Sequence, residues 1–471
     1  MITALAASGA LFYMLWDTGA LLPGWILWEE QQIPDGSGSY ELSLTDRTVH
    51  VTYEGDEIWN SPANIQVQQI LSLDIDRDRK DELILLCWKR GRYGKHRPFW
   101  VEKDEAGWSQ HLFVYEYEGR EIRPKWMSSY IGQDVAHMTG GGNKSGEKWL
   151  LLTDPEDFVN CWQWGSWGFV KEDKSVSFSV FGDNIIHAPI YTYGLNNGGN
   201  FDFLYEHVKG LIEESDISVI NQETPLVEDP REYGDFPRFG TPVQIGDAIV
   251  NAGFDVVLCA NNHVLDRGEK GIRTTKEFFD AHDLMCLGIR MPEEKEKKPY
   301  EIICRKGAKF ALFNYTYGLN GNPVPEGYIV HLLEDEAQIL GDIEKAADEA
   351  DLVVLFVHWG TENSTEIDEF QQRWTEVFKK SKADVVVGCH PHALQPCEEV
   401  KREDGHKMLV YYSIGNFVSA QSEKSCVKGG VANFTAAPGE DGYEITAYDL
   451  EPLQILWQEG GGYTAVPQKD F

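Results

Sequence analysis

The sequence predicts an α/β protein preceded by a mainly-β N-terminal domain. From about residue 175, short apolar segments typical of buried strands alternate with segments whose apolar residues recur at helical spacing, which is typical of a layered α/β domain. Twelve of the fifteen tryptophans lie before residue 170, so the first third of the chain has a core of different composition. We therefore expect three parts in the 471 residues: 1–30, 31–172 and 173–471.

The composition is that of a folded, acidic protein. Hydrophobic residues make up 42% of the chain and charged residues 25%, which excludes a mainly disordered chain. With 42 basic and 76 acidic residues the formal net charge is −34, and a field of this sign repels phosphate backbones, so nucleic acid is not expected as a partner. The eight cysteines form no CxxC pair, which favours single thiols over a disulfide framework.

The N-terminal part, 1–30, contains an apolar, uncharged run at residues 2–15. The run is shorter than the roughly 20 residues of a membrane-spanning helix and lacks the basic start of a signal peptide. Trp16, Trp25 and Trp28 flank it, as interfacial residues do. We interpret it as part of a membrane anchor, which would place the rest of the chain outside the cytoplasm. The alternative is an apolar segment packed on its own domain.

Residues 31–172 consist of short alternating segments separated by Gly, Asp and Asn, a pattern typical of antiparallel β-structure. One segment, LSLDIDRDRKDELILL, has carboxylates at the spacing of a calcium loop between two strands, namely Asp74, Asp76, Asp78 and Glu82. It resembles the calcium loops of FG-GAP-type β-propeller repeats. The alternative is a solvated acidic turn.

In residues 173–471, polar side chains that can bind metals follow five predicted strands. They are Asp183 and His187; Asn221 and Glu223; Asn261, Asn262 and His263; His358 and Glu362; and His390 and His392. Loops at the carboxyl ends of strands in an open α/β sheet gather at one site. Seven or eight nitrogen and oxygen ligands there would hold two divalent cations of the Mn, Fe or Zn class.

Each of these residues alone has a simpler interpretation, since a single histidine at a strand end is usually just hydrogen-bonded and Asn-Asn is usually a turn. Five strands that all end this way are improbable by chance. Two cations at such a site support hydrolysis, because they lower the pKa of a water and stabilise the developing oxyanion. Glu223 is the natural bridging carboxylate, and His263, next to Asn262, is positioned to act as a general acid. Asp266 either orients His263 or caps the following helix.

Six motifs, in this order, resemble the CapA family of the calcineurin-like metallophosphoesterase superfamily: GDNIIH, INQETPL, ANNHVLDRGEKGI, VHWGTE, GCHPHALQP and YYSIGNFV, over roughly residues 176–420. The resemblance implies a sandwich of two mixed β-sheets flanked by helices. It also implies the site: Asp183, His187 and His392 at one metal, Asn262, His358 and His390 at the other, Glu223 as the bridge and His263 as the catalytic histidine. From Asp183 to His187 the spacing is wider than the D-x-H of the superfamily.

Two functions from different classes fit these observations. The first is a hydrolase with two metal ions that cleaves a phosphoester or an amide-type bond, with capsule or poly-γ-glutamate as the polymer that the family name implies. The second is a membrane-anchored accessory protein without catalytic activity that acts in polymer synthesis or export. His263 favours the enzyme, because a purely structural metal site does not need it. The oligomeric state stays open.

Overall fold

The structure is a computed structural model that describes residues 22–34, 40–93, 99–458 and 462–468. It contains two compact units: the described residues up to Lys174 together with Pro438–Gly442, and Ser175–Ala437 together with the described residues from Tyr443 onward. Within the described ranges, no helix is both long enough and apolar enough to cross a membrane.

The predicted anchor falls mostly outside the described residues, which begin at residue 22. The two flanking tryptophans that are described contact the first unit. Trp25 packs against Trp88 with 6.0 Å between ring centroids, and the Arg47 guanidinium lies 3.9 Å from the centre of the Trp28 ring. These contacts are what a segment packed on its own domain makes, so they lend no support to an interfacial role for these two residues.

The first unit is built from three four-stranded sheets, each antiparallel and each formed by consecutive strands. Their strands are β1 (Gln31–Pro34), β2 (Tyr40–Thr45), β3 (Thr48–Tyr53) and β4 (Asp56–Asn60); β5 (Ile65–Leu73), β6 (Glu82–Arg90), β7 (Trp108–Glu118) and β8 (Glu121–Met127); and β9 (His137–Gly142), β10 (Lys148–Thr153), β11 (Val159–Gly165) and β12 (Gly168–Lys171).

Alternation along β6 explains why the β5–β8 sheet is covered on both faces. Leu83 and Leu85 belong to a buried cluster shared with β2 and β3, whereas Ile84 and Leu86 belong to a second cluster shared with β10. Successive side chains of a strand point to opposite faces, so a continuously apolar strand such as ELILLC can bury both. The predicted mainly-β N-terminal region is confirmed.

The second unit contains two mixed sheets. The eight-stranded sheet has the order β18-β17-β14-β13-β28-β29-β30, with β27 also paired to β13; the six-stranded sheet has the order β20-β21-β23-β24-β26-β25. Their strands are β13 (Val176–Asn184), β14 (Ile217–Gln222), β17 (Val256–Leu258), β18 (Met285–Leu287), β27 (Asn416–Val418), β28 (Lys428–Gly439), β29 (Gly442–Gln458) and β30 (Gly462–Pro467), and β20 (Tyr300–Arg305), β21 (Ala308–Thr316), β23 (Leu352–His358), β24 (Val385–Cys389), β25 (Cys397–Lys401) and β26 (Lys407–Tyr411).

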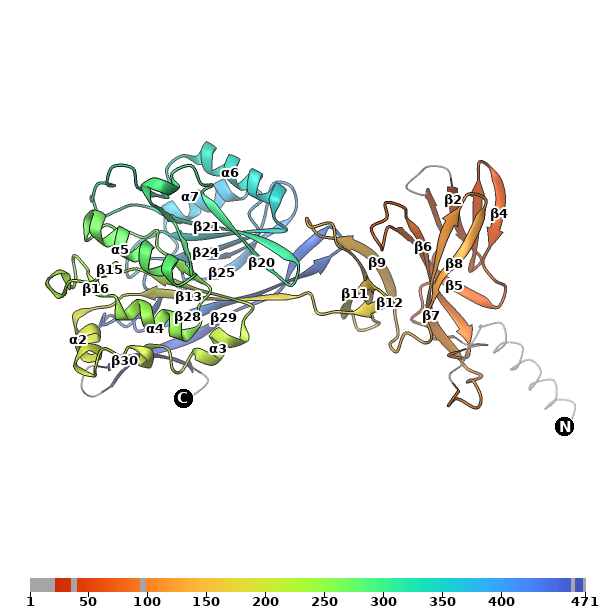
Figure 1. The fold of residues 1–471 in the computed structure, drawn as a ribbon, viewed down its shortest axis with the longest axis horizontal. Coiled ribbons are helices and arrows are strands. Elements are labelled where there is room, and N and C mark those ends of the chain that lie inside the picture. Colours follow the sequence, from red (N-terminus) through yellow and green to blue (C-terminus); the bar gives the residue numbers. More distant parts are fainter. Residues whose placement is uncertain (1–21, 35–39, 94–98, 459–461, 469–471) are drawn as a thin grey trace, which may run out of the picture. The chain divides into compact units, whose positions relative to one another are not determined.

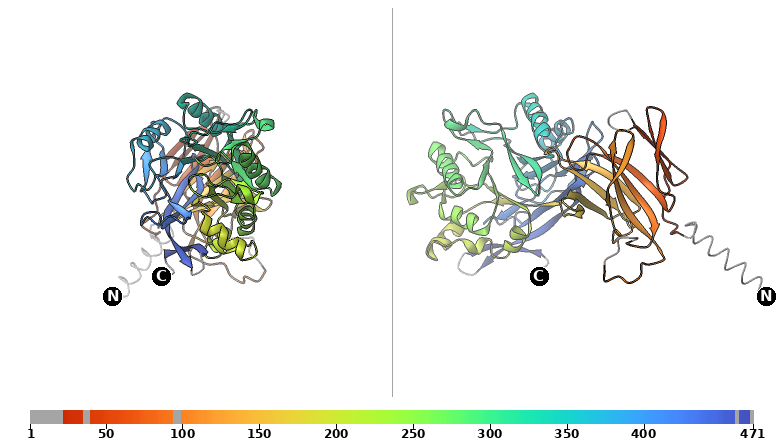
Figure 2. Two further views of the ribbon diagram at one scale, coloured as in Figure 1. Left: turned by 90° about the vertical axis from the view of Figure 1, so that its left-hand side faces the viewer. Right: turned by 45° about the vertical axis from the view of Figure 1, so that its right-hand side comes forward.

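Helices cover the outer faces of this sandwich (Figure 1 and Figure 2). The eight-stranded sheet packs against α2 (Ala188–Asn196), α3 (Lys209–Glu214), α4 (Gln244–Ala252) and α5 (Gly268–Ala281), and the six-stranded sheet packs against α6 (Glu336–Glu349) and α7 (Glu369–Phe378). Between the sheets, Phe178 and Phe310 meet edge to face at 5.0 Å. The predicted sandwich of two mixed sheets flanked by helices is confirmed.

Two helical segments differ from what the spacing of apolar residues predicts. The stretch 201–214 is not one helix but a 3-10 turn at Asp202–Leu204 followed by the short helix α3. Its apolar residues Phe201, Leu204 and Val208 are buried in the core although the segment is not a continuous helix. Gly210 lowers the local helix propensity. Helix α2 was not predicted, because its sequence APIYTYGLN is poor in strong helix formers.

Candidate metal centre

The polar residues that follow the strands of the second unit meet at one end of the sandwich. β13, β14 and β17 run parallel in one sheet, and β21, β23 and β24 run parallel in the other, so their carboxyl ends gather. Asp183 is the next-to-last residue of β13, Glu223 follows β14 and His358 ends β23. The loops after β17 and β24 carry the remaining candidates, Asn262, His390 and His392, and all six side chains are buried.

Their ligand atoms form overlapping groups within 4.8 Å of one another. These groups are Asp183, Glu223 and His392; Glu223, His358 and His390; and Glu362, His390 and His392. Glu223 belongs to two of them, which is the geometry a bridging carboxylate needs. The Asn262 Oδ1 lies 3.0 Å from His358 Nε2, so this amide joins the second group. The structure thus brings together all the candidate metal ligands except His187.

Backbone geometry fixes Asp183 in this cluster. A Cβ at Gly182 would lie 2.0 Å from the Gly415 oxygen, so glycine permits the close approach in which Asp183 N donates to that oxygen at 3.0 Å. The carboxylate accepts hydrogen bonds from the amide of Asn221, the backbone of His390 and the ring of His392, at 2.6, 3.1 and 2.9 Å.

The two histidines after β24 have backbone conformations that side-chain-bearing residues rarely adopt. The φ angles are +98° at His390 and +55° at His392. Such conformations cost of order 1–3 kcal/mol each and persist where the surrounding structure holds them. Here the bonds to Asp183 hold them, and both imidazoles stay in the cluster.

The electrostatics of the cluster favour a bound cation. Both oxygens of Glu223 are buried without a hydrogen-bond partner among the described residues, as is Nδ1 of His390. Burial and then the Asp183 charge raise the pKa of Glu223 well above its ordinary value. Burial lowers the pKa of His358 to about 3 and holds that of His390 well below its usual range, so both imidazoles are neutral, the form that binds metals.

The pKa of Asp183 is shifted in the opposite direction from that of Glu223. Burial of Asp183 alone would raise its pKa, but the hydrogen bond and the charge of His392 lower that pKa further than burial raises it. One ionised carboxylate, one carboxylate without hydrogen bonds to described residues and neutral imidazoles form a donor set suited to divalent cations. The residues therefore fit the predicted metals.

His263 and Asp266 form a buried pair beside the cluster. His263 Nδ1 lies 2.7 Å from Asp266 Oδ2, which also accepts a hydrogen bond from Phe239 N at 2.8 Å. Helix α5 begins at Gly268 with Arg267 as its N-cap, so of the two roles considered for Asp266 the contacts are those of orienting His263.

His187 occupies a different environment from the other candidate ligands. Its Nδ1 accepts a hydrogen bond from Ala420 N at 3.3 Å, and its ring meets Phe239 edge to face at 5.2 Å. It belongs to none of the ligand groups that the described residues form. The wider spacing after Asp183 puts His187 at the N-cap of α2 instead, a position with a backbone partner already in place.

In the first unit, the predicted calcium loop is only partly assembled. Oxygens of Asp74, Asp76 and Asp78 lie within 4.8 Å of one another, but Glu82 is not in this group. Glu82 accepts a hydrogen bond from Ile75 N and pairs with Lys125, which also contacts Asp76 at 2.5 Å. The ammonium group of Lys125 thus neutralises two of the four predicted ligands, and calcium binding at this loop stays a prediction.

Glu362, which the sequence places after an apolar strand together with His358, joins a ligand group. Two other residues of the site were not among the candidates. The Tyr317 ring lies 4.5 Å from that of His390, and burial and then the charges of Glu362 and Glu223 raise the pKa of Tyr317 to about 12. Asn314 is buried and binds the backbone of the loop after β17. Tyr317 follows an apolar strand, so the rule that identified the ligands applies to it; Asn314 lies inside a strand, where the sequence carries no such signal.

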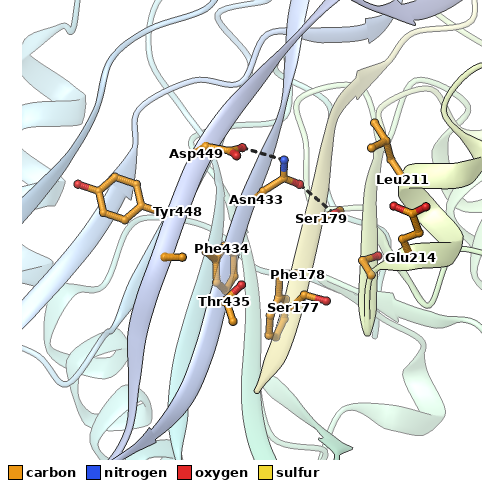
Figure 3. Close-up of a pocket in the computed structure, with 12 residues that line it drawn as sticks. Ser177, Phe178, Ser179, Leu211, Glu214, Asn433, Phe434, Thr435, Tyr448 and Asp449 are labelled. Atoms are coloured by element: carbon orange, nitrogen blue, oxygen red, sulfur yellow. Dashed lines mark hydrogen bonds between the residues drawn. The ribbon is translucent and has the colours of Figure 1, made fainter. Parts of the chain in front are cut away.

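A cavity of about 330 Å³ lies beside Ser177 and Ser179, at the end of β13 away from Asp183 (Figure 3). Asn433 lies between Ser179 and Asp449 there and bonds to both, at 2.9 and 2.8 Å. The amide of Asn433 is therefore paired within the protein, whereas the Glu223 oxygens at the opposite strand end have no hydrogen-bond partner among the described residues.

Residues 177–421 match the family model described as bacterial capsule synthesis protein PGA_cap. The match covers just over half of the chain and contains every candidate metal ligand. The chain belongs to this family. It is 29% identical over 262 residues to the capsule biosynthesis protein CapA of Bacillus anthracis, covering 53% of this chain and 61% of that one. It is 24% identical over 284 residues to the PGA biosynthesis protein CapA of Bacillus subtilis (strain 168), covering 59% and 72%.

This PGA_cap family member thus spans about three-fifths of the length of the first of these relatives. Among solved structures it is similar to the calcineurin-like phosphoesterase YfkN of Bacillus subtilis, with 15% identity, a TM-score of 0.35 and coverage of 59% of this chain and 90% of that one. It is also similar to the 5'-nucleotidase of Candida albicans SC5314, with 12% identity, a TM-score of 0.34 and coverage of 59% and 52%.

Proposed function

We propose that this protein is a hydrolase that depends on two divalent cations of the Mn, Fe or Zn class and acts in the biosynthesis of capsule or poly-γ-glutamate. The observation that carries the proposal is the Glu223 carboxylate, which is buried, has no hydrogen-bond partner in the described residues and belongs to two groups of possible ligands. A buried unpaired carboxylate is costly unless a cation compensates it. The names of the two Bacillus relatives, which refer to capsule and PGA biosynthesis, support the polymer.

The residues divide between two cations through the groups they form. Asp183 and His392 would hold one, Asn262, His358 and His390 the other, and Glu223 would bridge them. Two bound cations lower the pKa of a water and stabilise the charge that develops on the scissile group. Glu362, exposed at the edge of the cluster, forms a group with His390 and His392 and would be available to either cation.

His263 supplies the proton that the leaving group needs. The Asp266 carboxylate accepts from Nδ1, which leaves Nε2 of the imidazolium to donate. In the hydrolysis, a water oxygen forms the new bond to the scissile centre, the bond to the leaving group breaks, and one water proton passes to solvent. The Nε2 proton goes to the leaving atom, and His263 then regains a proton from solvent.

The test is hydrolysis of p-nitrophenyl phosphate and bis-p-nitrophenyl phosphate by the purified protein with manganese. We expect His263→Asn to lower kcat by about 10²- to 10⁴-fold while the bound manganese stays the same, because the general acid is lost and the ligands are not. Asp266→Asn should cost about 10- to 100-fold through loss of orientation. His282→Asn, at an exposed histidine, is the control. Equal rates for His263→Asn and wild type would refute the role of His263.

Incubation with poly-γ-glutamate distinguishes the hydrolase hypothesis from the accessory-protein hypothesis. Shortening of the polymer by the manganese-loaded protein supports the hydrolase. Binding without shortening supports an accessory role in synthesis or export.

We propose that the protein is located outside the cytoplasm. Two observations support this location: the apolar run at residues 2–15 and the polymer in the names of the relatives. Fractionation that finds the full-length product in the cytosol would contradict this location.

A further inference from the structure

A cavity of about 390 Å³ opens beside His263 and Asp266. The segment 236–238 forms one wall, Asn320 and Asn322 come from the loop after β21, and Glu362 comes from the loop after β23. Because His263 lines this cavity and donates its proton to the leaving group, the part of a substrate that fills the cavity is the leaving-group side. The chemistry of the walls therefore bears on which leaving group is accepted.

Arg238 is the cation of this cavity, and it is not neutralised by the protein. Residues 175–471 contain eight arginines, and six of them lie within 4.0 Å of a carboxylate. A seventh, Arg267, donates to the carbonyls of Glu232, Arg238 and Asp266. Of these eight described arginines, Arg238 is the one that lies within 4.0 Å of no carboxylate and donates its side chain to a single carbonyl, although the chain carries 76 acidic side chains.

The Arg238 side chain is nevertheless oriented. Its Nη2 donates to the Asp266 carbonyl at 3.2 Å, so the guanidinium is held against the residue that orients His263. The residue itself is exposed, and its other N–H groups have no described acceptor. A planar fork of donors in this state fits a carboxylate or a phosphate, which it can bind with two parallel hydrogen bonds.

Neutral amides connect this cavity to the metal ligands. Asn320 Oδ1 accepts from Asn262 Nδ2 at 3.4 Å, and Asn320 Nδ2 lies 3.5 Å from His263 Nδ1. Asn320 and Asn322 thus add polar groups to the cavity lining without adding negative charge. The acidic groups that line the cavity are Asp266, which is engaged with His263, and Glu362, which is available to a cation.

We propose that this cavity binds an acidic group on the leaving-group side of the substrate, with Arg238 as the residue that determines this specificity. The substrate class is then an ester or amide whose leaving group carries a carboxylate or a phosphate. A γ-linked glutamate chain has this property at every bond, since each residue carries a free carboxylate. The inference rests on the proposed function for the scissile bond, but the binding it predicts can be measured without turnover.

Three phosphate monoesters with matched leaving groups test it on the full, manganese-loaded chain: phenyl phosphate, 4-carboxyphenyl phosphate and benzene-1,4-diyl bisphosphate. We expect Arg238→Gln to lower the ratio of kcat/KM for the acidic substrates over phenyl phosphate by about 10- to 100-fold. Arg238→Lys should lower it less, because the charge stays and the fork is lost. Arg231→Gln, at an exposed arginine already paired with Asp229, should keep the ratio. The acidic substrate that loses more identifies the preferred anion.

A second arm uses calorimetric binding of tri-γ-glutamate, with and without manganese, and expects Arg238→Gln to raise Kd by about 10-fold or more. Weaker binding to this variant with no hydrolysis by any protein would overturn the hydrolase and leave the anion site standing. Hydrolysis with an unchanged ratio in Arg238→Gln would overturn the anion site and leave the hydrolase. A loss shared equally by all three esters would overturn it as well, because Arg238 would then act on the scissile group.

Discussion

At the scale of single residues, burial keeps several histidines of this protein neutral. In the ligand cluster this is useful, because a neutral imidazole is the form that binds metal. His331, outside the cluster, is only 8% exposed and has a buried Nδ1 without a described partner. Burial and then the Arg290 charge lower the pKa of His331 to about 3. Because His331 belongs to no ligand group of the described residues, its lowered pKa should appear as a free energy of unfolding that depends on pH.

The sign follows from proton binding. The unfolded chain binds a proton at His331 near pH 6.5 and the folded chain only near 3, so the stabilising contribution is complete above 6.5 and is lost as the pH falls towards 3. At pH 5 the expected loss is about 2 kcal/mol. Urea unfolding at pH 7.5 and pH 5 measures it: the wild type should lose about 2 kcal/mol more than His331→Gln, whereas His282→Gln should behave as the wild type. Equal losses in all three would contradict the assignment.

Residue types at strand ends could be predicted from the sequence, and roles that depend on contacts between distant loops could not. Asp183, Glu223, Asn262, His358, His390 and His392 share one signal, a metal-binding side chain directly after an apolar run. His187 carries the same signal but lies at the N-cap of α2, because the chain turns into a helix there. Arg238 carries no signal, since its importance comes from the absence of a carboxylate near its guanidinium.

At the scale of elements, the buried amide of Asn314 joins three parts of the metal centre. It projects from β21, and its Oδ1 accepts hydrogen bonds from Cys259 N and Ala260 N, at 3.0 and 2.7 Å. Its Nδ2 donates to Phe356 O, two residues before the ligand His358. Gly288, with φ +88°, leaves room for it, because a Cβ there would lie 2.4 Å from Asn314 Oδ1. The loop that carries Asn262 is thereby fastened to both sheets.

We expect Asn314→Ala to lower the free energy of unfolding by about 2 kcal/mol, because the buried Ala260 N–H loses its acceptor and the Cys259 N–H keeps only the Leu287 carbonyl. Manganese affinity should fall by about 10- to 100-fold, as the ligand loop is no longer held. Asn433→Ala is the matched control, since it also removes an amide bridge between elements but lies at the other end of β13. It should lower stability without changing manganese affinity. A loss of stability in Asn314→Ala with unchanged affinity would show that Asn314 does not position the ligands.

Most elements of the second unit follow from sequence periodicity. The apolar runs became β13, β14, β17, β21, β23 and β24, and the segments with helical spacing at 336–350 and 369–381 contain α6 and α7. The pairing of β28 with the opposite side of β13 did not follow, because it joins residues 250 to 260 positions apart through backbone hydrogen bonds that no side-chain pattern records. The family resemblance, and not the periodicity, predicted two sheets in place of one.

At the scale of the whole molecule, the two units have separate cores and different numbers of tryptophans. Buried clusters of β2–β8 and β6–β12 stabilise the first unit, and the clusters under α2–α5 and α6–α7 stabilise the second. Twelve of the fifteen tryptophans lie before residue 170, so tryptophan fluorescence reports mainly on the first unit. The predicted metal centre lies wholly in the second. A cation that binds there should therefore stabilise only part of the molecule.

We expect the midpoint temperature of one calorimetric unfolding transition to be higher in manganese than in EDTA. The midpoint temperature measured by tryptophan fluorescence should be the same in both. A ligand that binds only the folded state at 100 times its Kd adds about 2.7 kcal/mol to the stability. Both measurements are made in an Asp78→Asn background, so that a cation at the acidic loop of the first unit does not contribute. Glu223→Gln should abolish the calorimetric shift, because the bridging carboxylate is lost. A fluorescence transition that rises together with the calorimetric one would mean that the units unfold as one, and a shift that survives Glu223→Gln would mean that the stabilising cation binds elsewhere.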